Sequence, residues 1–221
     1  ITVGRTAMLQ DTLETLRRNL EKKPKHHQLF IAPRGSGKTH FLSLVEDEIQ
    51  RDPALVAGYQ VVRFPEEANR VCSFADFLLA IAEILHPSGH PWDDLYERLS
   101  VEEDDAVIAA TLSKAIRDQH RVSGRVLVLM VENPNQIMEE PLKKPQSIQA
   151  LRGFLMGDDG CLLIGTAPVH FGAHTRPDAP FYDFFDVQVL DPLGPEDTIE
   201  LIRRNLEWDG RQDLLARFAE L

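Results

Sequence analysis

A glycine-rich segment between an apolar run and a helical pattern constrains this chain more than any other feature. The segment reads Ala32-Pro33-Arg34-Gly35-Ser36-Gly37-Lys38-Thr39. It fits seven of the eight positions of the phosphate-loop pattern G-x-x-x-x-G-K-[ST], with Ala32 in place of the first glycine. An apolar run at 28–32 precedes it, and helical spacing at 38–50 follows it. Strand, loop and helix in this order predict a loop that binds phosphate.

The residue types in this loop match the chemistry of a nucleotide with Mg²⁺. Glycines allow the backbone to wrap tightly, so that successive N–H groups point inward at phosphate oxygens. We expect Lys38 to reach the β- and γ-phosphates, Thr39 to place its hydroxyl on Mg²⁺, and the backbone N–H of His40 to approach the α-phosphate. The predicted nucleotide-binding residues of the loop are Pro33, Arg34, Gly35, Ser36, Gly37, Lys38, Thr39 and His40.

Short apolar runs alternate with helical patterns along the whole chain. Runs typical of buried strands occur at 28–32, 59–64, 125–131, 161–166 and 187–190. Helical spacing occurs at 6–20, 38–50, 74–85, 101–120, 147–156 and 195–206. This alternation predicts a three-layer α/β fold with a five-stranded, mainly parallel sheet that is covered on both faces.

The overall charge is acidic. The 221 residues include 24 Lys and Arg against 35 Asp and Glu, which gives a formal net charge of -11. A uniformly basic surface that coats nucleic acid is therefore excluded, and charge gives no support to contact with DNA. Much of the acidity lies in residues 93–105, which we interpret as the solvated start of a helix over 101–120.

Cysteine content and hydropathy indicate the compartment. The two cysteines, Cys72 and Cys161, lack the spacing of a metal site or a disulfide framework. No apolar run approaches the length of a membrane span, and no leader pattern opens the sequence. We expect a cytoplasmic protein without membrane contact. Because the sequence opens without Met and ends in a helical pattern, we also expect it to be part of a longer chain.

The apolar run at 125–131 ends in Glu132 and Asn133. In phosphate-loop proteins such a strand supplies the carboxylate on the Mg²⁺ side, so we place Glu132 there beside Thr39. A register shifted by one residue is the alternative. In that register, Glu132 is the catalytic carboxylate and Val131 occupies the metal-side position.

At this point the sequence resembles a known family. Val3-Gly4-Arg5, followed by Leu9, is similar to the V-G-R-x-x-x-L segment of AAA+ ATPases of the initiator and origin-recognition type and of the related STAND signalling ATPases. The resemblance implies that Val3, Gly4 and Arg5 lie beside the adenine base. Residues 162–167 resemble the family's sensor-1 strand, which lies between the loop strand and the carboxylate strand. Thr166 would then face the γ-phosphate.

Two further positions follow from the same resemblance. Asn133 stands where AAA+ proteins keep the glutamate that polarises the attacking water, and an amide is no general base at neutral pH, so we expect slow hydrolysis. AAA+ assemblies also donate an arginine to the neighbouring subunit's nucleotide. Arg176 is the only arginine in the corresponding stretch before the last strand, and a solvated surface residue is the alternative interpretation.

The resemblance divides the chain into an ATPase domain at 1–191 and the start of a helical lid at 192–221. Within the lid, we expect Arg203 and Arg204 to be surface charges. The predicted function is an ATP-binding module that couples binding of ATP and Mg²⁺, with slow hydrolysis, to conformational change or assembly of a larger protein. Two alternatives stay open: a non-hydrolysing STAND-like switch that binds a protein partner, and an initiator-like ATPase that acts on DNA.

Overall fold

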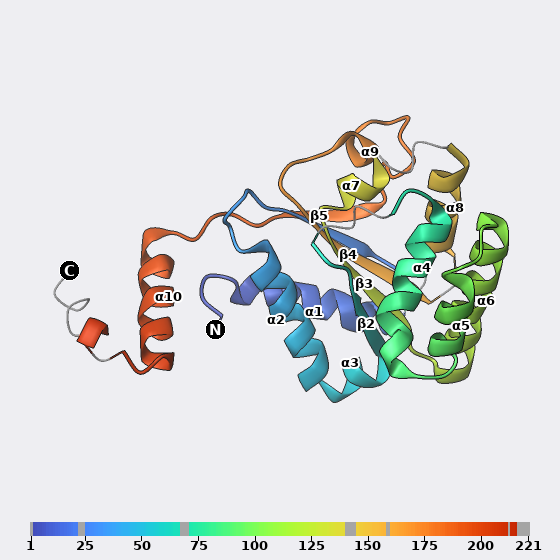
Figure 1. The fold of residues 1–221 in the computed structure, drawn as a ribbon. Coiled ribbons are helices and arrows are strands. Elements are labelled where there is room, and N and C mark those ends of the chain that lie inside the picture. Colours follow the sequence, from blue (N-terminus) through green and yellow to red (C-terminus); the bar gives the residue numbers. More distant parts are fainter. Residues whose placement is uncertain are drawn as a thin grey trace.

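A five-stranded sheet forms the centre of the molecule (Figure 1). The computed structural model describes residues 2–21, 25–66, 71–139, 145–157, 160–211 and 213–215. The strands are β1 (His27–Ile31), β2 (Tyr59–Arg63), β3 (Val126–Glu132), β4 (Cys161–Ala167) and β5 (Phe185–Val189). Their order in the sheet is β2-β3-β4-β1-β5, and every pairing is parallel. The predicted sheet is confirmed, and β4 lies between β1 and β3 as the resemblance implies.

The central strands are apolar because both faces of the sheet are covered. Every residue of β1, β3 and β4 is buried. Successive side chains of β3 alternate between two separate cores, with Val128 and Met130 in one and Leu129 and Val131 in the other. Helices on opposite faces of the sheet complete these two cores, which gives the predicted three-layer arrangement.

One face of the sheet carries the helices that flank the phosphate loop. These are α1 (Thr6–Glu21), α2 (Lys38–Arg51) and α3 (Pro53–Gly58). The opposite core includes residues of α4 (Phe74–Leu85), α6 (Asp105–Ser123) and α8 (Pro145–Met156), while α5 (Trp92–Leu99) packs on α4. Short helices α7 (Pro134–Met138) and α9 (Gly172–Thr175) and a 3₁₀ turn (His86–Ser88) lie in the connections.

The acidic stretch 93–105 differs from the prediction. It contains most of α5, which buries Trp92 and Leu99, and α6 begins at Asp105 rather than at 101. The side chain of Asp104 accepts a hydrogen bond of 2.8 Å from the backbone N–H of Ala106 and so caps α6. The helix over 101–120 was therefore predicted four residues too early, because a capping carboxylate and a helical one have the same charge.

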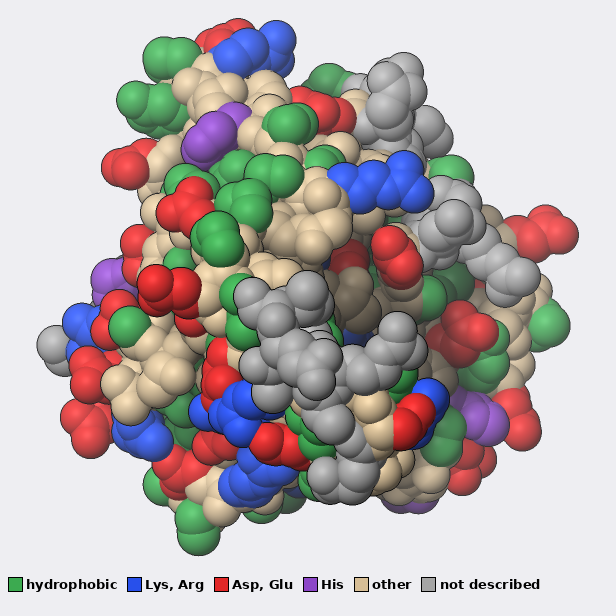
Figure 2. Space-filling model, turned by 90° about the vertical axis from the view of Figure 1, so that its left-hand side faces the viewer, with side chains coloured by type: hydrophobic (Ala, Val, Ile, Leu, Met, Phe, Trp, Pro, Cys, Tyr) green, Lys and Arg blue, Asp and Glu red, His purple; other side chains and the backbone are tan. Residues whose placement is uncertain are grey.

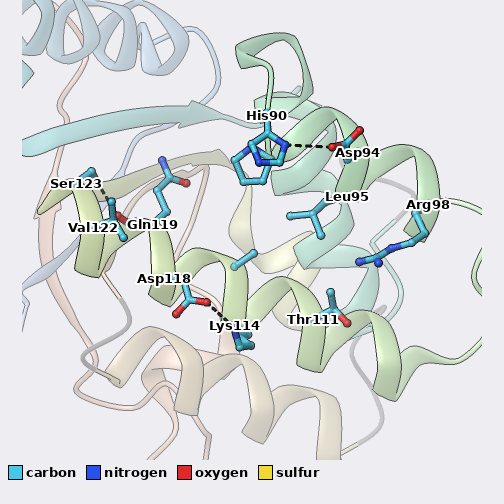
Figure 3. A pocket seen from close by; sticks show the side chains of 12 residues that line it. His90, Asp94, Leu95, Arg98, Thr111, Lys114, Asp118, Gln119, Val122 and Ser123 are labelled. Carbon is cyan, nitrogen blue, oxygen red and sulfur yellow. Dashed lines mark hydrogen bonds and ion pairs between the residues drawn. The ribbon is translucent and has the colours of Figure 1, made fainter.

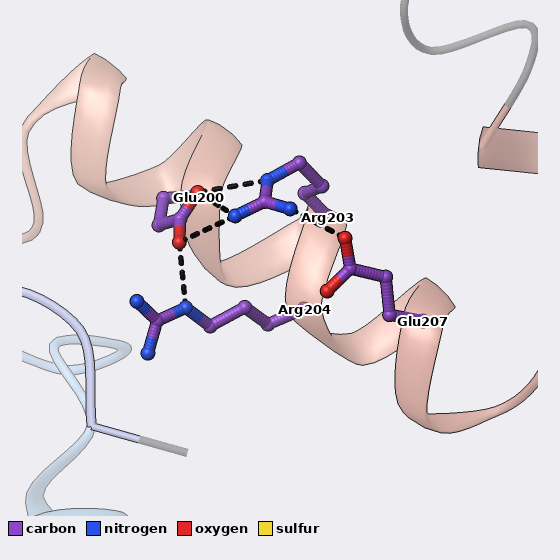
Figure 4. Close-up of polar contacts among 4 residues, drawn as sticks. All are labelled: Glu200, Arg203, Arg204 and Glu207. Carbon is purple, nitrogen blue, oxygen red and sulfur yellow. Dashed lines mark hydrogen bonds and ion pairs between the residues drawn. The ribbon is translucent and has the colours of Figure 1, made fainter.

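The last long helix, α10 (Pro195–Trp208), lies to one side of the sheet and buries none of its residues (Figure 1). Arg203 and Arg204 both bind Glu200, and Arg203 also binds Glu207 (Figure 4). Their assignment as surface charges is confirmed, because both arginines are exposed and paired within the helix itself. Across the described residues, no helix is long and apolar enough to cross a membrane.

Candidate nucleotide-binding site

The predicted site residues of the loop, β3 and β4 gather at one edge of the sheet. The loop of residues 32–37 follows β1, Glu132 ends β3, and Thr166 is the penultimate residue of β4. Because the strands are parallel, their carboxyl ends meet at this edge, where ligands bind in open α/β sheets.

The loop backbone adopts conformations that favour glycine. Gly35 and Gly37 both have a φ of 86°, a region that other residues enter at a cost of roughly 1–2 kcal/mol. Gly37 is also the N-cap of α2, and within the described residues no side chain caps that helix. The first N–H groups of α2 therefore face the loop as an anion-binding terminus.

Lys38 lies over the loop that precedes it. Its Nζ donates to the carbonyls of Ala32 and Pro33 at 3.3 and 3.4 Å. The hydroxyl of Ser36 donates to the carbonyl of Pro33, which tightens the turn. The exposed Pro33, Arg34 and His40 border this loop.

Thr39 and Glu132 meet across the site. Thr39 Oγ1 donates a hydrogen bond of 2.7 Å to Glu132 Oε2, and the Glu132 side chain is only 4% exposed. A hydroxyl and a carboxylate are hard oxygen donors of the kind that Mg²⁺ prefers, so the donor set fits this ion. The alternative register would require Val131 at the metal-side position, but Val131 lies in the apolar core.

Arg63, the last residue of β2, is a member of this site that the sequence did not indicate. Its Nη2 lies 3.5 Å from Glu132 Oε1 and donates to the carbonyl of Thr39 at 3.1 Å. Its Nη1 donates to Ser43 Oγ at 2.8 Å and to Glu46 Oε2 at 3.1 Å. The only sequence signal for it is a charged residue that ends an apolar strand.

Asn133 and Thr166 lie next to Glu132. Thr166 is the β4 partner of Glu132, and its carbonyl accepts a 2.7 Å hydrogen bond from the backbone N–H of Asn133. Asn133 has a φ of 54°, a left-handed conformation that asparagine tolerates better than most residues. Thr166 is fully buried, and among the described residues its hydroxyl has no hydrogen-bond partner. This orphaned hydroxyl fits a position where a polar ligand group is to be bound.

The N-terminal segment forms one wall of a cavity of about 430 Å³ beside the loop. Val3, Arg5, Ser36 and His40 line it together with Leu193 and Thr198 from the start of the expected lid. This volume falls in the range of small-molecule pockets.

Arg5 joins the two sides of this cavity. Its Nη2 donates to the carbonyl of Ser36 at 3.1 Å and also to the carbonyl of Asp191. Burial lowers the pKa of its guanidinium, and the carboxylates of Asp191 and Asp197 oppose that shift.

The surroundings of Gly4 explain why a glycine precedes Arg5. Gly4 has a φ of 63°, and a Cβ at this position would lie 2.6 Å from Asp197 Oδ2 and 2.8 Å from Leu193 Cδ2. A Cβ here would force the side chains of Asp197 and Leu193 to move, and the left-handed φ itself disfavours any other residue.

Arg176 does not reach the phosphate loop. It is exposed, lies 3.9 Å from Asp178 and lines a separate cavity with Glu139. No residue of the loop lines that cavity, as far as the described chain extends.

A larger cavity of about 630 Å³ lies elsewhere, between α5 and α6 (Figure 3). Leu95 and Arg98 of α5 face Lys114 and Asp118 of α6 across it. None of the predicted site residues lines this cavity. On the face of the molecule seen in Figure 2, acidic and basic side chains are intermingled.

Solved structures share this fold. The ORC2 protein of Aeropyrum pernix has a TM-score of 0.65 at 14% identity, and the match covers 92% of this chain and 52% of that protein. The ORC1 protein of the same organism, in complex with DNA, has a TM-score of 0.62 at 15% identity, with 96% and 50% covered. Cdc6p of Pyrobaculum aerophilum has a TM-score of 0.57 at 15% identity, with 90% and 48% covered.

The chain thus spans about half the length of each of these proteins. No protein-family model matches the sequence, and no curated protein sequence does. At 14–15% identity, the likeness is one of fold. The chain has the α/β fold of the AAA+ P-loop NTPases.

Proposed function

We propose that this chain is the ATP-binding module of a larger AAA+ protein and hydrolyses ATP slowly. One observation carries the proposal, namely the hydrogen bond between Thr39 of the loop and the buried Glu132 at the end of β3. This contact brings a hydroxyl and a carboxylate to a glycine-rich loop at the N-terminus of α2, where backbone N–H groups suit phosphate.

Each loop residue has a distinct task in this proposal. The backbone N–H groups from Gly35 to His40 bind phosphate oxygens, and Lys38 exchanges its carbonyl partners for the β- and γ-phosphates. Thr39 and Glu132 hold Mg²⁺, which supplies charge neutralisation of the phosphates when it is bound. Thr166 donates its orphaned hydroxyl toward the γ-phosphate.

Asn133 makes hydrolysis slow because its amide accepts no proton from water at neutral pH. It orients a water molecule without acting as a base. This same residue favours the second candidate function, a non-hydrolysing nucleotide switch that binds a protein partner. An ATPase that acts on DNA is the third candidate. One structure with this fold is bound to DNA, but the net charge of -11 argues against such contact by this part of the chain.

Arg5 couples the nucleotide to the lid in this proposal. It contacts the loop at Ser36 and the connection to α10 at Asp191, so a change at the loop reaches residues 192–221 directly. We assign those residues to a lid and residues 1–191 to the ATPase domain. Arg176, exposed on a separate surface, is available to a neighbouring subunit's nucleotide in an assembly.

Calorimetric titration with ATP and Mg²⁺ tests the proposal. We expect binding by the wild-type chain and a loss of at least about a hundredfold in affinity for Lys38→Ala, since two charged contacts to phosphate are removed. Arg51→Ala, which removes an exposed cation at the other end of α2, is the control and leaves the affinity unchanged. Equal affinities for wild type and Lys38→Ala would overturn the proposal.

A further inference from the structure

Arg63 presents a positive charge to the carboxylate that is proposed to hold Mg²⁺. It ends β2, the strand next to β3, and its guanidinium lies 3.5 Å from Glu132 Oε1. The other oxygen of Glu132 accepts the Thr39 hydrogen bond at 2.7 Å. The two oxygens of one carboxylate are therefore engaged by different groups.

The guanidinium is held firmly in this place. Both terminal nitrogens are bound, one to the Thr39 carbonyl and the other to Ser43 and Glu46. These three residues follow one another along a single face of α2, so the helix presents a continuous row of acceptors. The planar fork of arginine fits such a row, which lysine would not satisfy.

Glu132 needs a cation nearby. It is 4% exposed, and a buried carboxylate without a partner is strongly unfavourable. Glutamate also has one more rotatable bond than the aspartate usual at the metal-side position, so its carboxylate needs an additional contact to stay in place. Arg63 supplies both the charge and that contact.

We propose that Arg63 is a positioning residue that neutralises Glu132 when Mg²⁺ is not bound, and that Mg²⁺ competes with it for this carboxylate. The inference rests on the proposed function. Its consequence is a weak dependence of ATP binding on Mg²⁺. Without Arg63, the triphosphate approaching a metal-free site would meet an uncompensated negative charge, which repels it. With Mg²⁺ bound, the metal itself provides the compensation.

The experiment compares ATP affinity in Mg²⁺ and in EDTA for the full 221-residue chain, by calorimetry. The measured quantity is the ratio of the dissociation constant in EDTA to that in Mg²⁺. We expect this ratio to rise about tenfold in Arg63→Gln, through weaker binding in EDTA, with affinity in Mg²⁺ close to wild type. Arg51→Gln is the matched control, since Arg51 forms ion pairs on the same helix far from Glu132, and it leaves the ratio unchanged.

A second background tests whether Arg63 acts through Glu132. In Glu132→Gln, which carries no negative charge, adding Arg63→Gln is expected to leave the ratio unchanged. A ratio that rises equally in both backgrounds overturns the inference. If thermal unfolding shows that Arg63→Gln does not fold, Arg63→Met preserves the apolar stem and carries the same expectation.

Other outcomes separate this inference from the proposed function. An unchanged ratio in Arg63→Gln, or an equal loss of affinity with and without Mg²⁺, overturns the role of Arg63. If Lys38→Ala abolishes binding in that same series, the proposed function stands and the inference alone fails. Absence of ATP binding by the wild-type chain overturns both.

Discussion

The hydroxyl of Thr39 donates a 2.7 Å hydrogen bond to Glu132 across 93 positions of sequence. The contact joins the first turn of α2 to the carboxyl end of β3, and it pairs Glu132 rather than Val131 with the loop. A hydroxyl oxygen and a carboxylate oxygen are thus held together at the proposed Mg²⁺ site.

Removing the Thr39 hydroxyl should weaken ATP binding only when Mg²⁺ is present. In Thr39→Ala we expect affinity with Mg²⁺ to fall about tenfold, because one oxygen ligand is lost, while affinity in EDTA stays near wild type. Thr39→Ser keeps the hydroxyl and should bind within about twofold of wild type. Calorimetry in both buffers measures this, and a similar loss in EDTA would show that Thr39 acts on phosphate instead.

Replacing Asn133 by glutamate should raise ATP turnover. A carboxylate that accepts a proton from the attacking water typically contributes about 10²–10⁴-fold, so an increase of at least about tenfold is expected even with imperfect placement. The left-handed backbone at this position also predicts a stability loss of about 1 kcal/mol. Asn133→Gln carries the same backbone strain without the carboxylate and is the control. Phosphate release at saturating ATP measures turnover, and equal rates for the two variants would refute the assignment of this position.

Shortening Arg5 should loosen the nucleotide cavity. Arg5→Ala loses the hydrogen bonds to Ser36 and Asp191, so we expect ATP affinity to fall about tenfold and the fluorescence of Trp208 on α10 to change less on adding ATP. Arg17→Ala removes an arginine of α1 that pairs with an acidic partner, Asp52, and serves as the control. Wild-type affinity in Arg5→Ala would exclude a role for this bridge.

Acidification should destabilise the fold through His27. This side chain is 3% exposed and stacks on Phe184, with ring centroids 4.4 Å apart. Its Nδ1 accepts from the N–H of Leu163 at 3.0 Å, and its Nε2 lies 3.1 Å from the carbonyl of Leu155. These contacts require the neutral ring, and burial lowers the pKa of His27 from 6.5 to about 4.

The folded and unfolded chains take up the His27 proton at different pH values. The unfolded chain binds it near pH 6.5 and the folded chain only near pH 4, so the stability present above pH 6.5 is lost as the pH falls toward 4. Between pH 7 and pH 5 this histidine should lower the free energy of unfolding by about 2 kcal/mol. Urea denaturation at both pH values measures the change. In His27→Gln, which does not titrate, the difference should shrink by that amount, and an unaltered pH dependence would contradict the prediction.

Sequence patterns located the strands well because burial on both faces makes them continuously apolar. Residues 125–131 and 161–166 were predicted within one residue of β3 and β4. The edge strand β5 begins at Phe185, two residues before the prediction of 187–190, because several of its side chains are exposed and its pattern is mixed. The helix α5 was missed because only its two ends are buried and the residues between them are largely charged.

The candidate site also contains residues that the sequence predicts and one that it does not. The loop residues are contiguous, so a local pattern contains them, and the position of Glu132 follows from the strand that carries it. The place of Arg63 in the site depends instead on contacts with distant residues. Its partners on α2 are 17 to 24 positions away in the sequence, and Glu132 lies on the neighbouring strand β3. Only the strand order, which places β2 beside β3, brings its charge to Glu132.

The bridge made by Arg5 also bears on how the chain folds. It joins residues 186 positions apart, so the cavity beside the loop is complete only after the chain has been synthesised and folded through Asp191. Bringing together residues so far apart in the sequence costs more chain entropy than forming the contacts within residues 32–37. A ligand that binds only the completed cavity stabilises the folded chain by mass action, so the proposed binding of ATP would also favour completion of the fold.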